Sequence, residues 1–109
     1  GLEPKAESYK NWIGLDGHVG GHYLSAMAMN YASTGYQECK KRMEYMLTEL
    51  KACQDANAKN HPVWGVGYVG GVPESSKIWS DFQKGNLGPF RRSWVPWYNL
   101  HKMYVSAVL

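Results

Sequence analysis

Two apolar series with helical spacing, separated by one glycine, constrain the fold of this chain more than any other feature. In residues 21–34, apolar side chains recur at intervals of three and four, at Leu24, Met27, Ala28 and Tyr31. Residues 36–57 repeat that spacing at Cys39, Met43, Met46, Leu47, Leu50 and Cys53. Both patterns predict amphipathic helices. Because Gly35 suits a left-handed helix end and leaves a link of only one or two residues, we expect an antiparallel helical hairpin.

The second half of the chain alternates irregular segments with helices. Residues 58–73, rich in glycine and proline, predict a long loop of the kind that often carries a functional site. A short helix is expected over residues 75–84, then an irregular segment, then a last helix over residues 97–109. The apolar side chains that we expect the short helix to bury are Ile78, Trp79 and Phe82. The last helix ends almost wholly apolar and should have neighbours on all sides. We therefore predict an all-α fold of about four helices, arranged as helical hairpins.

Length limits this architecture to one domain. The 109 residues are 44% hydrophobic and 19% charged, which is typical of a packed soluble protein. Two hairpins resemble the repeating unit of a helical toroid or solenoid, but they are too few to close a ring. A chain of this size would also leave apolar surface open. We expect residues 1–109 to form a single incomplete helical domain that oligomerises or belongs to something larger.

Charge and hydropathy disfavour several classes of protein. The net charge is +3, with basic residues scattered apart from short runs at 40–42 and 91–92, so nucleic-acid binding is not indicated. No apolar stretch reaches about 18 residues, the length that predicts a membrane span. The first 13 residues lack the basic and apolar blocks of a signal peptide. Gly1 in place of Met suggests a processed start, which leaves the native targeting signal open.

Three motifs in order carry a family resemblance. They are "GLDGHVGGHYLSAMAMNYASTG" in residues 14–35, "YVGGVP" in residues 68–73 and "WVPWYNLHKMY" in residues 94–104. Together they resemble the amino-terminal part of the catalytic domain of the β-L-arabinofuranosidase family of glycoside hydrolases. The resemblance implies an (α/α)6 toroid, of which this chain would form a part. It also suggests a periplasmic or secreted location.

The same resemblance implies a zinc-bound cysteine nucleophile, with glutamate and further cysteines as ligands, in a later part of the domain. This chain has only Cys39 and Cys53, neither in a matching motif. Fourteen residues of one helix span about 21 Å, so these two thiols cannot share a zinc ion or a disulfide within one chain. We interpret them as core thiols and expect no cofactor in this chain, with zinc bound only in full-length relatives.

His18 and His22, four residues apart among glycines, allow three interpretations. A metal site needs both imidazoles on one helical turn and a third ligand such as Asp16, whereas Gly17, Gly20 and Gly21 favour placing His18 in the turn before the helix. A structural interpretation has Asp16 or nearby backbone cap the helix while the glycines permit close helix packing. In the third, which we favour, the imidazoles bind sugar hydroxyls.

The resemblance adds further candidates for sugar binding. His101 follows Trp97 by one helical turn and shares its face, although a core histidine is the alternative. An apolar face for a sugar ring would come from Trp64, Trp94 or Trp97, and the loop from Tyr68 to Pro73 is expected beside the glycine–histidine turn. The carboxylates Glu74 and Asp81 are not favoured as a catalytic pair, because they lie on a short helix expected to face solvent.

The predicted function is therefore a fragment or truncated relative of a glycoside hydrolase that acts on arabinofuranose-containing glycans. It would lack the zinc-cysteine centre and would have no activity alone. It would contribute part of the sugar-binding wall, formed by His18, His22, Tyr68, Trp94, Trp97 and His101. The expected partners are carbohydrate and either a second copy or the remainder of the domain. The alternative is a non-catalytic helical module that self-associates through exposed apolar helix faces. A small zinc enzyme is a third, less favoured hypothesis.

Overall fold

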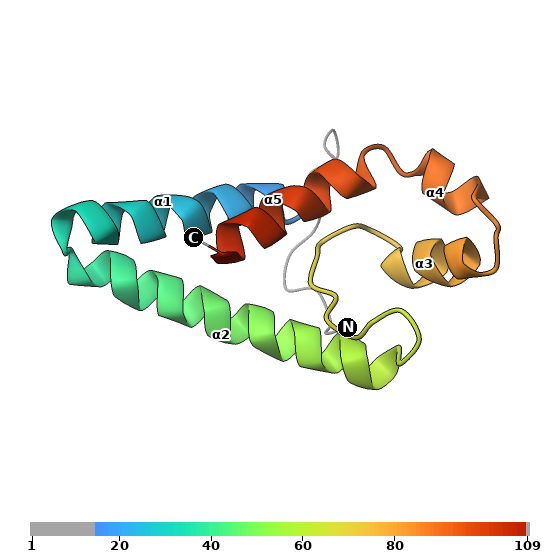
Figure 1. Ribbon diagram of the computed structural model, residues 1–109, viewed down its shortest axis with the longest axis horizontal. Coiled ribbons are helices and arrows are strands. Elements are labelled where there is room, and N and C mark those ends of the chain that lie inside the picture. Colours follow the sequence, from blue (N-terminus) through green and yellow to red (C-terminus); the bar gives the residue numbers. More distant parts are fainter. Residues whose placement is uncertain (1–14, 109) are drawn as a thin grey trace.

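The computed structural model describes residues 15–108, within which it has five helices and no strand (Figure 1). The helices are α1 (His18–Thr34), α2 (Gln37–Asn60), α3 (Ser75–Gln83), α4 (Gly88–Arg92) and α5 (Pro96–Val108). The all-α prediction is confirmed. The helix beyond the expected four is α4, a short turn within the segment predicted to be irregular, with a proline in its first turn. The predicted end of the last helix at Leu109 lies outside the described residues, as do the first 13 residues, in which no signal peptide was expected.

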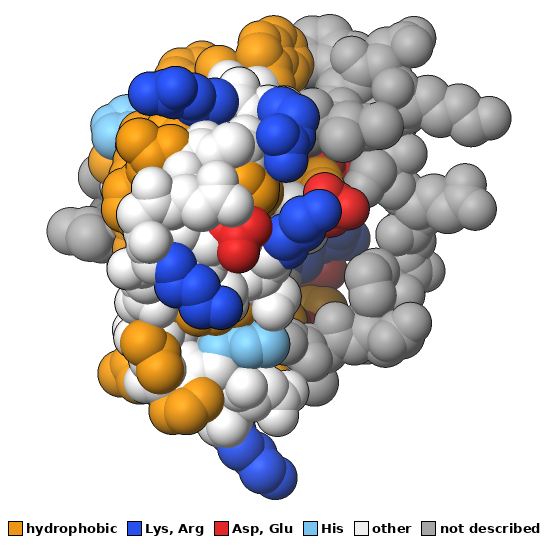
Figure 2. Space-filling model, turned by 90° about the vertical axis from the view of Figure 1, so that its right-hand side faces the viewer, with side chains coloured by type: hydrophobic (Ala, Val, Ile, Leu, Met, Phe, Trp, Pro, Cys, Tyr) orange, Lys and Arg blue, Asp and Glu red, His pale blue; other side chains and the backbone are white. Residues whose placement is uncertain are grey.

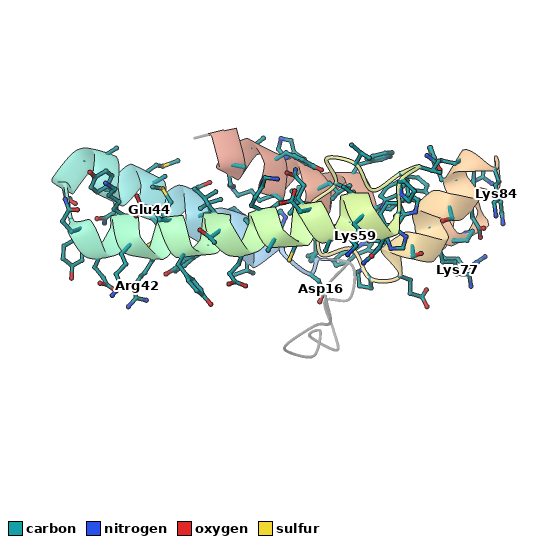
Figure 3. All side chains as sticks on the ribbon, turned by 90° about the horizontal axis from the view of Figure 1, so that it is seen from below. Asp16, Arg42, Glu44, Lys59, Lys77 and Lys84 are labelled. Carbon is teal, nitrogen blue, oxygen red and sulfur yellow. The ribbon has the colours of Figure 1, made fainter. Side chains whose placement is uncertain are left out.

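The predicted hairpin is present: α1 and α2 run antiparallel and side by side (Figure 1). Gly35 ends α1 with a φ of 70°, in the left-handed region that glycine adopts without steric cost, and its N–H donates to the Tyr31 carbonyl oxygen at 2.8 Å. The outer face of α2 carries exposed ion pairs such as Arg42–Glu38 at 3.0 Å. Figure 3 shows Arg42 and Glu44 along the half of α2 nearest this turn, while Lys77 and Lys84 lie at the opposite end of the molecule.

Helix α1 also packs against α5, so it contacts two helices (Figure 1). Gly21 is buried at this contact, and a Cβ placed on it would lie 2.9 Å from the Lys102 carbonyl oxygen. The hydroxyl of Ser25 donates to that of Ser106 across the seam at 2.8 Å. Small residues therefore allow the two backbones to approach closely, as the structural interpretation of the glycines predicted.

The main hydrophobic core lies where α3 and the loop before it meet α5. Its buried members are Tyr68, Val72, Ile78, Trp79 and Leu100. Trp64 and Phe90 pack against it. The predicted burial of Ile78 and Trp79 is confirmed, but that of Phe82 is wrong: it is 37% exposed, because it lies on the outer edge of the ring cluster.

Helix α5 is covered on one side only. Asn99, Leu100, Met103 and Ser106 are buried, whereas Trp97 and Tyr98 are more than half exposed. The neighbours expected on all sides of this helix are thus absent among residues 15–108. None of the helices in that range combines the length and the apolar character needed to cross a bilayer.

Candidate functional site

Helix α1 begins earlier than the sequence predicts, and this changes the position of His18. Gly17, with a φ of 88°, turns the chain into the helix, and His18 is the first helical residue. The prediction that His18 lies in the turn before the helix is therefore wrong. Gly17 is the N-cap without any side-chain hydrogen bond, so the suggested side-chain cap is absent; the His18 N–H instead donates to the Leu15 carbonyl oxygen at 3.0 Å.

His18 and His22 consequently face each other across one turn of α1. Their Nε2 atoms are 3.2 Å apart, within hydrogen-bonding distance, and the ring centroids are 4.9 Å apart in an edge arrangement. Tyr98 of α5 stacks on the other side of His18, with ring centroids 4.8 Å apart and planes inclined by 21°. The three rings form a continuous cluster that joins α1 to α5.

The environment of His18 disfavours the charged form of its imidazole. Burial lowers its pKa below the ordinary value, and the nearby charges of His22, Lys102 and His101 lower it further. One edge of the ring is enclosed, since its Nδ1 is buried without a hydrogen-bond partner. A neutral imidazole has one donor and one acceptor nitrogen, which suits exchange of hydrogen bonds with hydroxyl groups.

The seam between α1 and α5 holds these rings in place. Asn99, 2% exposed, donates from Nδ2 to the Asp16 carbonyl oxygen at 2.8 Å, which anchors the segment just before α1. Ser106 accepts from Ser25 and itself donates to the Lys102 carbonyl oxygen at 2.7 Å. The sequence distance across these contacts exceeds 80 residues, so the imidazole cluster is assembled by tertiary packing.

The remaining predicted site residues are less closely grouped. His101 is exposed on α5, so the alternative of a core histidine is wrong; its charge acts on His18. Trp97 is 57% exposed, and its ring centroid lies 5.2 Å from that of buried Trp79. Trp94, 61% exposed, lies between α4 and α5. Trp94 and Trp97 line a pocket together with Tyr98, the ring that stacks on His18, so the tryptophans border the histidine cluster through Tyr98.

An aromatic groove of about 420 Å³ lies beside the α3–α5 contact. Its lining includes Trp64, Tyr68, Trp79, Phe82, Trp97 and Tyr104. A volume of this size is within the range of small-molecule sites, about 300–1,000 Å³. In Figure 2, which views the α3–α4 end, apolar side chains are exposed between scattered basic ones.

Tyr68 lies in the core beneath this groove. It is 9% exposed, its hydroxyl is 2.8 Å from that of Ser75, and burial raises its pKa. Tyr104 fixes the loop beside the groove to α5, because its hydroxyl donates to the Gly67 carbonyl oxygen and accepts from the Val69 N–H, each at 3.1 Å. Because Tyr68 is buried, the exposed aromatic surface of the groove is formed mostly by other residues.

The described residues do not fit a zinc-thiolate centre. Between residues 15 and 108, no three histidine, cysteine, aspartate or glutamate side chains are grouped as a zinc-thiolate centre would require. Cys39 is buried, with its thiol 3.4 Å from the Asn30 side-chain oxygen, and Cys53 is partly buried elsewhere on α2. Of the two carboxylates that were not favoured, Glu74 is exposed and Asp81 accepts a hydrogen bond from Asn86.

Sequence reasoning missed Tyr98 and Lys102, which border the histidine cluster. The signal was present: Tyr98 precedes His101 by three residues and Lys102 by four, so the three share a helix face. The stack of Tyr98 on His18 depends on the packing of α5 against α1, which no local pattern predicts.

Comparison with known proteins identifies the family. No curated protein and no solved structure matches the chain. A family model does: it is described as the beta-L-arabinofuranosidase, GH127 catalytic domain, and it matches residues 1–109. The whole sequence is thus covered, in agreement with the resemblance of the three motifs. This chain belongs to the GH127 β-L-arabinofuranosidase family of glycoside hydrolases.

Proposed function

We propose that this chain contributes part of the sugar-binding wall of a glycoside hydrolase that acts on arabinofuranose-containing glycans. The observation that carries the proposal is the convergence of His18, His22 and Tyr98 at the α1–α5 seam, with His101 nearby. Membership of the family supplies the class of substrate. The remainder of an (α/α)6 toroid would complete the site around this wall.

The chemistry of the cluster suits a furanose. His22 is exposed, and the lowered pKa of His18 favours a neutral imidazole whose Nε2 faces His22, so a sugar hydroxyl can replace one imidazole as a hydrogen-bond partner. Exposed Trp97 or Trp94 offers an apolar face of the kind that packs against sugar rings. Tyr68 would act from beneath, by supporting the aromatic groove.

Bond cleavage is not assigned to the described residues. The zinc-bound cysteine nucleophile that the family implies does not fit residues 15–108, so no catalytic step is derived from them. We expect this chain alone to leave a chromogenic β-L-arabinofuranoside uncleaved.

Titration calorimetry with arabinose-containing oligosaccharides tests the binding proposal. We expect weak binding that decreases in His22→Ala and in Trp97→Ala. Tyr45→Ala is the control, because Tyr45 is 66% exposed on α2 and belongs neither to the histidine cluster nor to the aromatic groove. Unchanged binding in both site variants, or an equal loss in the control, would refute the proposal.

The exposed aromatic surface supports a second candidate, a helical module that self-associates. Trp94, Trp97 and Tyr98 are each 57–61% exposed, and Val63 is 77% exposed. Clustered apolar surface of this kind is typical of interaction sites. Sedimentation velocity distinguishes the two functions: a stable dimer that is indifferent to sugar favours the module, whereas a monomer that binds sugar excludes it.

A further inference from the structure

The geometry of His18 and His22 points to a second ligand class: we propose that this imidazole pair binds one divalent transition-metal ion, such as Ni²⁺, through both Nε2 atoms. The site differs from the zinc-cysteine centre of the family, since it contains no thiol and lies at the start of α1. The inference does not rest on the proposed sugar binding, but the ion and a sugar hydroxyl would compete for the same nitrogens.

The distance between the two donor atoms fits a shared ion. Two metal–nitrogen bonds of about 2.1 Å that span the observed 3.2 Å enclose an angle of about 100°. This value lies between the angles of about 90° and 109° found in octahedral and tetrahedral coordination. The ion would take the place of the present hydrogen bond, with the two imidazoles turned so that both Nε2 lone pairs point at it.

The helix supplies the rigidity that a two-ligand site needs. Residues four apart lie on one face of a helix, and a histidine pair at this spacing is a recurrent metal-binding arrangement. The Tyr98 ring restricts His18 from the α5 side, while His22 remains exposed to solvent. Water molecules would complete the coordination, because no third protein ligand is grouped with this pair among residues 15–108.

The charges near the pair bear on its affinity. Lys102 and His101 are both close enough to act on His18, and both oppose a further positive charge. Imidazole is nevertheless a preferred ligand of Ni²⁺, Cu²⁺ and Zn²⁺, and the affinity generally rises from Co²⁺ through Ni²⁺ to Cu²⁺. We therefore expect reversible binding by imidazole-preferring ions and no binding of Mg²⁺ at equal concentration.

Calorimetric titration of the whole chain with NiCl₂ tests this inference. We expect one ion per chain, at least a tenfold loss of affinity in His18→Gln and in His22→Gln, and no change in the control His61→Gln. Ni²⁺ should also broaden NMR signals selectively around residues 18–22 in the unmodified chain, which requires no variant to fold.

Affinity that survives either substitution, or broadening centred elsewhere, would overturn the inference. The sugar titration is run separately in the presence of a chelator. Sugar binding without Ni²⁺ binding would refute only the metal site, and Ni²⁺ binding without sugar binding would refute only the proposed function.

Discussion

The close approach of α1 to α5 makes neighbouring glycines respond in opposite ways to the same substitution. In Gly21→Ala, the new Cβ would lie 2.9 Å from the Lys102 carbonyl oxygen and 3.1 Å from its carbonyl carbon, so backbone must move. In Gly20→Ala, the new Cβ would meet only the ends of two flexible side chains, Met46 Cε at 3.2 Å and Met103 Cε at 3.8 Å. The pair therefore isolates the seam from the general effect of alanine in a helix.

The expected free energies of unfolding differ in sign. Alanine in place of glycine stabilises a helix by about 0.5–1 kcal/mol, a gain that both variants share. Overpacking costs about 1–3 kcal/mol, and loss of the Ser25–Ser106 hydrogen bond, as α5 moves away, costs about 0.5–1.5 kcal/mol. We expect Gly20→Ala to be slightly stabilising and Gly21→Ala to be destabilising by about 1–2 kcal/mol.

Urea denaturation, followed by the circular dichroism of the helices at about 222 nm, measures the free energy of unfolding of both variants. A loss of 1–2 kcal/mol corresponds to a fall in Tm of roughly 5–15 °C for a domain of this size. If Gly21→Ala is as stable as Gly20→Ala, then α5 does not pack against α1 at the distance described, and the position of His18 against Tyr98 loses its support.

Three further predictions concern the caps and polar contacts around the same helix. Asn99→Ala should destabilise the chain by about 1–3 kcal/mol, measured by urea denaturation, because it leaves the Asp16 carbonyl oxygen without its buried donor; Asn86→Ala on the surface should change stability far less. Gly35→Ala should cost about 1–2 kcal/mol in the same assay, since its φ of 70° is unfavourable for alanine; an unchanged midpoint would contradict the left-handed cap. The pKa of His18 is lower in the folded chain than in the unfolded chain, so as the pH falls below about 6.5 the unfolded chain takes up a proton before the folded chain does. The contribution of His18 to the free energy of unfolding should therefore be complete above that pH and decrease below it until the folded-state pKa is reached. Thermal denaturation in chelator-containing buffers from pH 7.5 to 5 checks the sign, and a His18→Gln variant with an equally steep dependence would contradict the assignment to His18.

Local periodicity predicted the helices well. The three- and four-residue spacing of apolar side chains located α1 and α2, and Gly35 marked the turn between them, because each depends on residues adjacent in sequence. The same reasoning placed α3 and α5 to within about one residue at their starts. Only α4, which spans five residues in a segment full of glycine and proline, lacks a sufficient periodic signal.

The candidate site was less predictable, since it depends on contacts between distant segments. Three glycines near His18 suggested a turn, but Gly17 alone takes the left-handed conformation there, which lets the helix start at His18. The stack of Tyr98 on His18 follows from the pairing of α1 with α5, which the spacing within either helix does not encode. The family motifs pointed to the histidines without revealing that they touch.

The separation in sequence between α1 and α5 bears on how the chain acquires its structure. The hydrogen bonds Ser25–Ser106 and Asn99–Asp16 each close a loop of more than 80 residues, so they form only after nearly all of this segment has left the ribosome. Until then α2 is the helix among residues 15–108 that packs most closely on α1, and the side of α1 that faces α5 stays exposed to chaperones or to other nascent chains. Long-range closure of this kind slows folding, which makes docking of α5 the expected rate-limiting event in refolding.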